Sequence, residues 1–511
     1  MAIVGVKIGR GAAAIGSNTA IGNNALAANT TGAQNAGFGF QSLKTNTTGN
    51  SNTAIGFSAI YSNTTGNNLT AVGDQALYAN TTGVGNIAIG SATLNYNTTG
   101  NYNTAVGNGN TGTSAGALGL NTTGSNNTAV GYQALLLSTT ASNNTAVGSA
   151  AGYTNTTGAG VTALGYRALY LNTTGSENVA IGGSYSSYSA LYFNTTGSNN
   201  TALGAGALSL NTTANNNTAV GYQAGYSNTT GTTNTAIGGQ ALYSNTTASE
   251  NTAIGYQAVY TNTTGFGLTA IGLYALRNNT TAAYNTAVGY SALQLTTTGA
   301  NNVSVGVSAL YSNTTGGNNT AIGRDALILN TTGTNNTAFG KDSGNTITTG
   351  TYNTMLGNNA QASAATNNYE LVISASTGIT GKGSSTGFIY PNAGGVFQGN
   401  NSANWSTTSD RRLKKNIVDN NTGLEKIVSI QVRNFEYRLP EEVDAELKST
   451  DAIPNKGVQL GVIAQELAQV LPECVKTEST GVMSVDTDNL TWYLINAVKE
   501  LNAKITALEN K

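Results

Sequence analysis

Histidine is absent from this chain of 511 residues, cysteine occurs once, and only 8% of the residues are charged. An ordinary globular protein carries about 25% charged residues. The missing histidine excludes a Ser-His-Asp triad, and Cys474 cannot form an intrachain disulfide, so we expect it in a core. The formal net charge of −1 offers no basic surface for nucleic acid. We expect no cofactor, no metal, and neither nucleic acid nor a membrane among the partners.

Long apolar runs are missing as well. No window approaches 18 apolar residues, and the first ten residues lack the charged segment and apolar stretch of a secretory signal. We therefore expect neither a membrane-spanning helix nor an export signal. A bacterial surface protein would need an export route that this sequence does not show.

The few charges are unevenly placed. Residues 1–400 hold 14 of the 43 charged residues and residues 401–511 hold the other 29, which predicts a domain boundary near residue 400. Glycoside cleavage normally needs paired carboxylates. Among the scarce carboxylates of the repeats, Asp325 and Asp342 lie one repeat apart in similar phase. This scarcity argues against a polysaccharide-cleaving enzyme, and we expect no activity on an external substrate.

The dominant feature that is present is an internal repeat of seventeen residues, roughly N-T-A-I-G-x-x-A-L-x-x-N-T-T-G-x-x. Its T-A-(I/V)-G glycine recurs from Gly22 to Gly357, and Gly5 is in phase, which gives 21 coils. Two steps are longer, 24 residues to Gly131 and 22 residues to Gly204. The pattern predicts a β-solenoid over residues 1–357, in which each coil pairs only with its neighbours.

Within one coil, T-A-I-G and A-L-x-x are candidate strands and N-T-T-G is a candidate turn. We expect Ile, Val and Leu to form inner ladders, and Asn and Thr to form hydrogen-bonded ladders at the corners. Stacking at about 4.8 Å per coil would give a rod of roughly 100 Å. Two or three apolar residues per coil bury little, so we expect several chains to share a core.

The array resembles the head repeats of trimeric autotransporter adhesins, which carry a similar A-(I/V)-G unit. That resemblance implies a trimeric β-roll. Two further features invite a functional interpretation. The extra residues of coils 108–130 and 183–203 predict side loops and are candidates for receptor contact. A tyrosine row predicts a stacked ladder, with a sugar-binding stripe as the alternative; its members are Tyr61, Tyr78, Tyr170, Tyr243, Tyr260 and Tyr311.

After Gly357 the repeat stops, and residues 358–408 read as short strands and turns. The run Ser409-Asp-Arg-Arg-Leu-Lys follows, and the motifs Asn434-Phe-Glu-Tyr, Gly461-Val-Ile-Ala-Gln-Glu-Leu and Leu471-Pro-Glu come after it in order. Together they resemble the intramolecular chaperone family found at the C-terminus of endosialidase tail spikes and phage fibres. The resemblance covers about the last hundred residues.

The residues of this segment also predict structure by themselves. Asp410 is a candidate N-cap, and Ile463, Leu467 and Val470 predict a short helix that ends near Pro472. The final helix carries an apolar seam at steps of four and three, formed by Leu494, Val498, Leu501, Ile505 and Leu508. We interpret the seam as a coiled coil between chains. The alternative is an amphipathic helix packed on its own domain.

The family resemblance implies self-cleavage by a Ser–Lys dyad immediately before the motif serine. Carried over, Ser409 is the nucleophile, Lys414 is the base, and Thr408–Ser409 is the cleaved bond. A serine needs a neighbouring base, and a lysine serves only when burial or nearby positive charge favours its neutral form. The alternative is that this run is simply a capped, solvated start of a helix.

Taken together, we predict a mainly β protein. A repetitive trimeric β-solenoid shaft (1–357) and a β connector (358–408) precede a small α+β chaperone domain (409–511) that ends in a coiled-coil helix. The resemblance implies a virion structural protein, a homotrimeric tail fibre made in the host cytoplasm. Its implied partners are a host-cell receptor, expected to be a glycan, and other virion tail proteins. A bacterial trimeric surface adhesin is the alternative.

Overall fold

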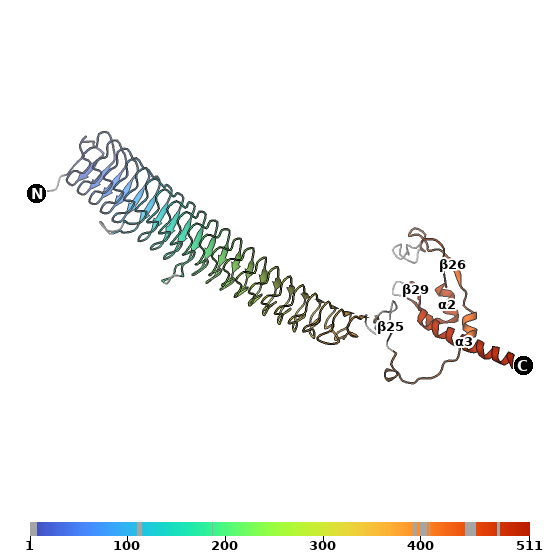
Figure 1. The fold of residues 1–511 in the computed structure, drawn as a ribbon. Coiled ribbons are helices and arrows are strands. Elements are labelled where there is room, and N and C mark those ends of the chain that lie inside the picture. Colours follow the sequence, from blue (N-terminus) through green and yellow to red (C-terminus); the bar gives the residue numbers. More distant parts are fainter. Residues whose placement is uncertain are drawn as a thin grey trace. The chain divides into compact units, whose positions relative to one another are not determined.

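The computed structural model of the protein describes residues 8–109, 115–185, 188–391, 396–398, 406–407, 409–444, 456–477 and 481–510. The chain divides into two compact units, Met1–Thr408 and Ser409–Lys511. The first unit is a stack of coils and the second is a small domain of helices and short strands (Figure 1).

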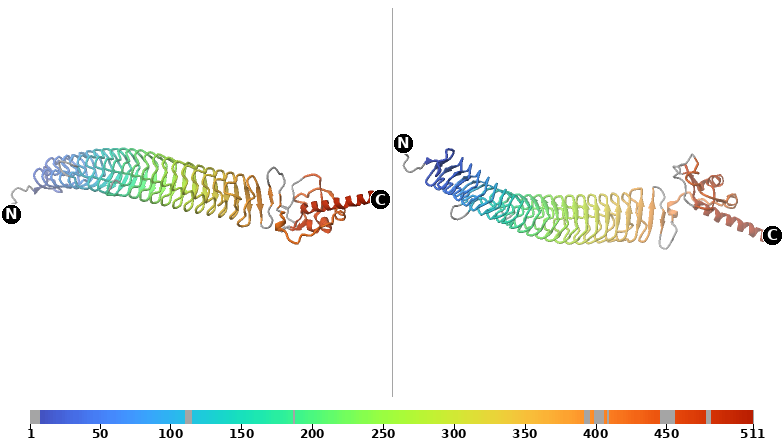
Figure 2. Two further views of the ribbon diagram at one scale, coloured as in Figure 1. Left: turned by 60° about the horizontal axis from the view of Figure 1, so that its bottom comes forward. Right: turned by 90° about the horizontal axis from the view of Figure 1, so that it is seen from above.

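Each repeat places its Thr-Ala-(Ile/Val) triplet in a three-residue strand. From β2 to β21, every strand pairs in parallel with the strand of the next coil, as in Thr53↔Thr70 and Ala54↔Ala71. Figure 2 shows these coils stacked side by side along the shaft. The predicted mainly β solenoid is therefore confirmed. The strands are β1 (Ile8–Gly9), β2 (Thr19–Ile21), β3 (Ala36–Phe38), β4 (Thr53–Ile55), β5 (Thr70–Val72), β6 (Ile87–Ile89), β7 (Thr104–Val106), β8 (Thr128–Val130), β9 (Thr145–Val147), β10 (Thr162–Leu164), β11 (Val179–Ile181), β12 (Thr201–Leu203), β13 (Thr218–Val220), β14 (Thr235–Ile237), β15 (Thr252–Ile254), β16 (Thr269–Ile271), β17 (Thr286–Val288), β18 (Val303–Val305), β19 (Thr320–Ile322), β20 (Thr337–Phe339) and β21 (Thr354–Leu356).

The strand triplet buries its middle residue. In β4, Ala54 is fully buried, whereas Ile55 is 43% exposed. Successive side chains of a strand point to opposite faces, so a triplet with Ala inside must turn its third residue outward. The prediction that the Ile and Val of T-A-(I/V)-G line the interior is therefore wrong.

The A-L-x-x segment is a turn and not the predicted strand. Its Leu has a left-handed backbone in most coils, with φ of 50° at Leu43 and 56° at Leu77. The chain reverses its direction there within a few residues, yet the Leu43 N–H still donates to the Ala59 carbonyl of the next coil at 3.0 Å. Gly225 takes this place in one coil with φ of 60°, because glycine adopts that backbone without strain.

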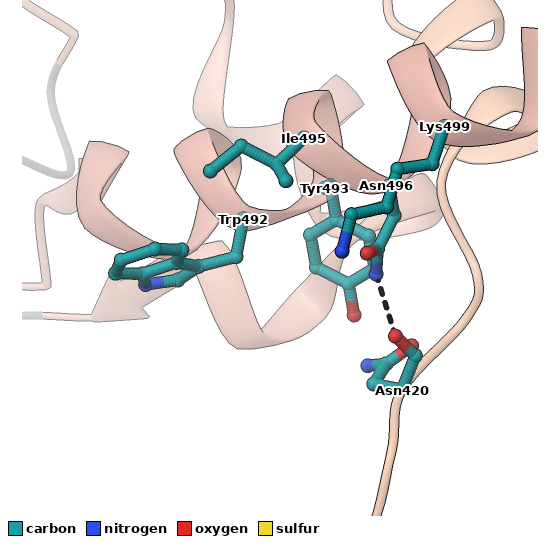
Figure 3. A pocket seen from close by; sticks show the side chains of 6 residues that line it. All are labelled: Asn420, Trp492, Tyr493, Ile495, Asn496 and Lys499. Atoms are coloured by element: carbon teal, nitrogen blue, oxygen red, sulfur yellow. Dashed lines mark hydrogen bonds between the residues drawn. The ribbon is translucent and has the colours of Figure 1, made fainter. Parts of the chain in front are cut away.

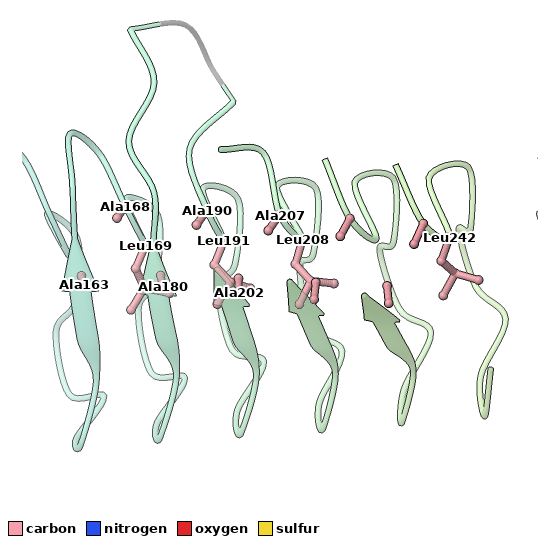
Figure 4. Packing of buried hydrophobic residues seen from close by; sticks show 14 of the residues in the cluster. Ala163, Ala168, Leu169, Ala180, Ala190, Leu191, Ala202, Ala207, Leu208 and Leu242 are labelled. Carbon is pink, nitrogen blue, oxygen red and sulfur yellow. The ribbon is translucent and has the colours of Figure 1, made fainter. Parts of the chain in front are cut away.

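The core of the shaft lies inside a single chain. In a typical coil, one Leu and two Ala side chains are fully buried and pack on the equivalent side chains of the neighbouring coils (Figure 4). Leu191, for example, lies between Leu169 and Leu208, all three essentially inaccessible to solvent. The expectation that the coils are too thin to bury a core without other chains is therefore wrong. Small Ala side chains let the two walls of the coil approach closely enough to enclose the Leu column.

Buried asparagines form the predicted ladders. Asn63 is inaccessible, and its Nδ2 donates to Asn46 Oδ1 of the preceding coil at 2.7 Å and to the carbonyl of Gly66 at 3.0 Å. Threonine adds a second ladder, in which Thr47 Oγ1 donates to the Thr64 carbonyl at 2.8 Å. Buried amides are tolerated because such partners replace water.

Most of the tyrosine row forms stacked ladders, as predicted, although no ring stacks on Tyr311 among the described residues. Tyr61 stacks on Tyr78 at 4.9 Å, and Tyr243 stacks on Tyr226 and Tyr260 at 5.2 and 5.1 Å. Burial raises the pKa of the Tyr226 and Tyr243 hydroxyls. Neighbouring rings cover the ring faces on which a sugar would stack, so this geometry favours the ladder interpretation over a sugar-binding stripe.

The two long coils leave the strand ladder intact. Strand β7 pairs directly with β8, and β11 pairs directly with β12. In coil 183–203 the described extra residues therefore leave the stack as a side loop, as predicted, whereas residues 110–114 of the first long coil lie outside the described residues. In the second loop, Tyr185 is 97% exposed and stacks on Tyr166, while Tyr188 packs against Tyr226.

The coil geometry continues past the last sequence repeat. Strands β22 (Leu371–Ser374) and β23 (Gly387–Tyr390) extend the parallel stack, and β24 (Val396–Gln398) and β25 (Ser406–Thr407) then pair in antiparallel fashion. Glu370 is buried in the asparagine column at this end. Its carboxylate accepts hydrogen bonds from the backbone N–H groups of Ser363 and Gly383 at 3.1 and 2.8 Å, which joins two of the last coils.

The second unit contains short elements around one long helix. They are η1 (Arg411–Leu413), α1 (Leu424–Val428), β26 (Arg433–Phe435), β27 (Gln459–Gly461), α2 (Ala464–Val470), η3 (Pro472–Cys474), β28 (Val475–Thr477), β29 (Met483–Val485) and α3 (Thr487–Glu509). Leu467, Leu471 and Cys474 form its small buried core. The predicted short helix before Pro472 is thus confirmed, and so is the predicted core position of Cys474.

Candidate processing site

The two predicted dyad residues lie side by side at the start of the second unit. Lys414 Nζ lies 2.7 Å from Ser409 Oγ, within hydrogen-bond distance. The single 3-10 turn η1 separates them and folds the chain back, so the five-residue spacing becomes a direct contact. This is the distance that a serine and its general base require.

Asp410 fixes the turn between the dyad residues. Its carboxylate caps η1 by accepting from the Arg412 N–H at 2.8 Å, and it also pairs with the Arg412 guanidinium. These hydrogen bonds hold the pKa of the Asp410 carboxyl below its usual range. The predicted N-cap is therefore confirmed, and the capped turn coexists with the Ser–Lys contact.

Ser409 and Lys414 are exposed in the single chain. The cations Arg411 and Lys415 lie next to them in the sequence and are exposed as well. Thr408, the other residue of the predicted cleavage site, lies outside the described residues. The roles predicted for Ser409 and Lys414 therefore rest on their mutual distance and on the chemistry of the pair.

The segment after the dyad is anchored on helix α3. Asn496 Nδ2 donates to the backbone carbonyl of Asn420 at 2.8 Å (Figure 3), and it also donates to the carbonyl of Thr422 at 3.2 Å. Gly423 approaches the helix so closely that a Cβ there would lie 2.2 Å from the Ala497 nitrogen. Only glycine fits, because any side chain would collide with the helix backbone. This anchor was not predicted from the sequence, because it joins residues more than seventy positions apart.

Helix α3 uses two faces differently. Leu490, Tyr493 and Ala497 face its own unit, and Ala497 is buried there. The predicted seam is exposed along its whole length, from 45% to 69%; its residues are Leu494, Val498, Leu501, Ile505 and Leu508. The alternative that the seam packs on its own domain is therefore wrong for the part of the chain that is described.

A second contact ties α3 to the small core. The Tyr493 hydroxyl donates to the Glu473 carboxylate. This hydrogen bond lowers the pKa of Glu473 and raises the pKa of Tyr493. Burial raises the pKa of the Cys474 thiol, which keeps that thiol protonated and inert.

Outside the dyad, the described residues offer little for other chemistry. Asp325 and Asp342 pair with their neighbours Arg324 and Lys341 at 3.1 and 2.8 Å. No group of three His, Cys, Asp or Glu side chains that could hold a metal occurs among the described residues. Nor does any described helix have both the length and the apolar character to cross a bilayer.

Residues 409–476 match the family model described as the chaperone of endosialidase. The match begins at Ser409, which is also the first residue of the second compact unit. It covers well under half of the chain and so describes this segment and not the shaft. No curated protein and no solved structure gave a significant match. The resemblance to a C-terminal chaperone is thereby confirmed for residues 409–476.

Proposed function

We propose that the protein is a homotrimeric virion tail fibre whose C-terminal segment guides assembly and then releases itself between Thr408 and Ser409. One observation carries the cleavage proposal. Lys414 Nζ and Ser409 Oγ lie 2.7 Å apart, at the first residues of a segment that matches the chaperone of endosialidase. The β-solenoid in front of that segment supplies the fibre shaft.

The proposed cut is an attack by a serine on the peptide bond that precedes it. Ser409 Oγ attacks the carbonyl carbon of Thr408, while the neutral Lys414 amine takes the hydroxyl proton and passes it to the departing Ser409 nitrogen. The amide thus becomes an ester on Ser409 Oγ. Water then hydrolyses the ester, which leaves a carboxylate on Thr408 and free Ser409.

Assembly supplies the condition that this chemistry needs. A lysine acts as a base only when neutral, and burial or neighbouring positive charge favours that form. In the single chain Lys414 is exposed, with Arg411, Arg412 and Lys415 close by in the sequence. Two further copies packed around this segment would bury the amine. Cutting is thereby delayed until the trimer has formed.

The exposed apolar seam of α3 supports a trimer. It presents five aliphatic side chains to solvent over two heptads. Exposing so many apolar side chains is unfavourable for a single chain, and packing against the same helix of other copies would bury them. Because Asn496 anchors the segment after the dyad on the same helix, packing of three α3 helices would gather three dyad segments. The seam and the processing site are therefore parts of one assembly device.

The proposed place of the trimer is the virion, after synthesis in the host cytoplasm. The fibre would bind a host-cell receptor, proposed to be a glycan, and join other tail proteins. The exposed Tyr185 in the side loop of coil 183–203 is the candidate contact for the receptor. A bacterial trimeric adhesin is the second candidate, which the similarity to adhesin head repeats favours.

Intact-mass spectrometry of three variants tests the cut. Ser409→Ala removes the nucleophile and should abolish cleavage, and Lys414→Arg should do nearly the same, because a guanidinium keeps its proton near neutral pH. Lys415→Ala is the matched control and should impair cutting much less than either. All three should still trimerise. An uncut wild-type trimer, or cutting of Ser409→Ala at the same bond, would remove the peptidase and leave the fibre.

A further inference from the structure

The third residue of each strand triplet forms a column along the outside of the shaft, which we name the outer apolar column. Ala fills the inside of the strand, so this third residue faces solvent in the single chain. Ile271, for example, is 39% exposed. The column runs through Ile21, Phe38, Ile55, Val72, Ile89, Val106, Val130, Val147, Leu164, Ile181, Leu203, Val220, Ile237, Ile254, Ile271, Val288, Val305, Ile322, Phe339 and Leu356.

Every strand from β2 to β21 places an aliphatic or aromatic residue in this column, and none places a polar one there. The residue two positions later behaves differently, although it is exposed to a similar degree. Leu273 is 38% exposed, against 39% for Ile271 in the same coil. That second column, which we name the mixed column, includes Asn23, Asp74, Ser91, Tyr222, Gly239, Arg324 and Lys341. Two outward positions of the same repeat, with similar exposure, thus differ in the residue types that they carry.

Strand propensity alone does not explain the difference. β-branched residues suit strands, but threonine does so as well as isoleucine or valine. Threonine occupies the other outward position of most triplets yet never enters the outer apolar column. Leucine and phenylalanine, which are not β-branched, do enter it, as at Leu203 and Phe339. The residues of the column therefore share their apolar character and not a preference for strands. An apolar side chain at an outward position is stabilising only when another surface covers it.

The geometry points to other copies of this chain as the cover: we infer that three shafts pack in register along the outer apolar column. The column repeats once per coil over twenty strands, and a partner must repeat at the same rise to match it along that length. A second copy of the shaft has the same rise per coil, because its sequence is the same. Neither outward position of β2–β21 carries a charged residue, so identical faces meet without repulsion. The inference rests on the homotrimer proposed above and adds the surface that joins the shafts.

Cysteine labelling of matched positions tests it. Ile271→Cys and Leu273→Cys are made separately in the full Ser409→Ala chain, which keeps the C-terminal segment attached. Each protein is treated with a polar maleimide and with a short bis-maleimide, and mass spectrometry of peptides separates these thiols from Cys474. In the trimer, Cys at 271 should react at least about tenfold more slowly with the maleimide than Cys at 273, because the reagent reaches position 271 only when the packed shafts open locally. The bis-maleimide reaches position 271 through the same slow openings, and after prolonged treatment it should join two copies through position 271 alone.

Light scattering on the same samples separates the possible failures. A trimer in which both thiols react equally fast would overturn the packing surface and leave the proposed fibre intact. Protection of position 271 without a crosslink between copies would show a different occupant and overturn the inference. A monomer would contradict both the packing and the homotrimer itself. Ile271→Lys, compared with Leu273→Lys, gives an independent measure, since only the first should lower the melting temperature of the trimer.

Discussion

In the shaft, Leu276 and Ala275 are fully buried by the coils on either side, whereas in the C-terminal unit Val418 and Leu460 stay 84% and 76% exposed. The shaft closes its core within one chain, because each coil repeats the same Ala and Leu positions. The C-terminal unit buries only a small cluster around Leu467 and leaves the seam of α3 open.

In the proposed trimer, the C-terminal unit is the one that would gain more of its burial from partner copies. A unit that exposes so much apolar surface gains free energy by assembling, at about 25 cal/mol for each Å² buried. An open cavity of about 860 Å³ in the same unit, lined partly by Phe435, Leu460 and Met483, adds to that surface. We therefore assign the first association of chains to the C-terminal unit and the lasting rigidity to the shaft.

Deletion of residues 409–511 tests this division most severely. Without the unit that brings chains together, the shaft should be produced as aggregates or as disordered chains, with little soluble trimer. The same shaft, once made from the full chain and separated by cutting, should remain folded. Solubility and light scattering measure both. A normal trimer from the deleted chain would make the C-terminal unit a passive appendage.

Substitutions within one coil test the closed core of the shaft. Leu276→Ala should destabilise the surrounding coils by about 3 kcal/mol, because it leaves a cavity in the Leu column. Leu273→Ala, from the mixed column of the same coil, should cost less than about 0.5 kcal/mol. Hydrogen exchange of the amides in the neighbouring coils reports the difference. Equal effects would mean that the buried column does not hold the coils together.

Asn496→Ala tests the anchor between the processing segment and α3. Loss of two hydrogen bonds to Asn420 and Thr422 should slow self-cleavage several-fold without dissolving the trimer, because the seam residues are unchanged. Lys499→Ala, one helical turn away, is the control and should cut at the wild-type rate. Cleavage followed by intact mass gives both rates. Unaltered cutting in Asn496→Ala would separate the dyad from the helix.

The smallest effect concerns acid. The pKa of Glu473 is lowered in the folded protein by the Tyr493 hydroxyl, so this contact contributes stability above the unfolded value of about 4.3 and loses it as the pH falls through the folded value. Tyr493→Phe should therefore lower the melting temperature of the C-terminal unit at pH 7, and the difference from the wild type should shrink as acid protonates the Glu473 carboxylate. A difference that does not shrink with falling pH would point to packing and not to the carboxylate.

The sequence predicted the repeat, the stack of coils and the asparagine ladders, because each follows from spacing and residue type. It did not predict which apolar residue of T-A-(I/V)-G faces inward, since Ala and Ile are both apolar. Only the narrow interior of the folded coil, which accommodates the smaller Ala, decides between them. The left-handed Leu was unforeseen, because leucine rarely adopts positive φ. The signal was present in Gly152, Gly225 and Gly344, which occupy the same column.

The candidate site divides in a similar way. The pairing of Ser409 with Lys414 was implied by the family resemblance and not by the residue types alone, and the contact is local, within one turn of the chain. The anchor formed by Asn496 and Gly423 depends on how distant segments fold together, and neither residue has a chemistry that marks it in the sequence.

The mass of the uncut Ser409→Ala chain in solution tests the account most directly. Light scattering on the purified protein, in buffer without detergent, should give three times the chain mass of 51.8 kDa. Such a result would support the homotrimer, and the labelling at positions 271 and 273 would then decide whether the outer apolar column joins the copies. A stable monomer of 51.8 kDa, with a folded shaft, would contradict the homotrimer and with it the coupling of cutting to assembly.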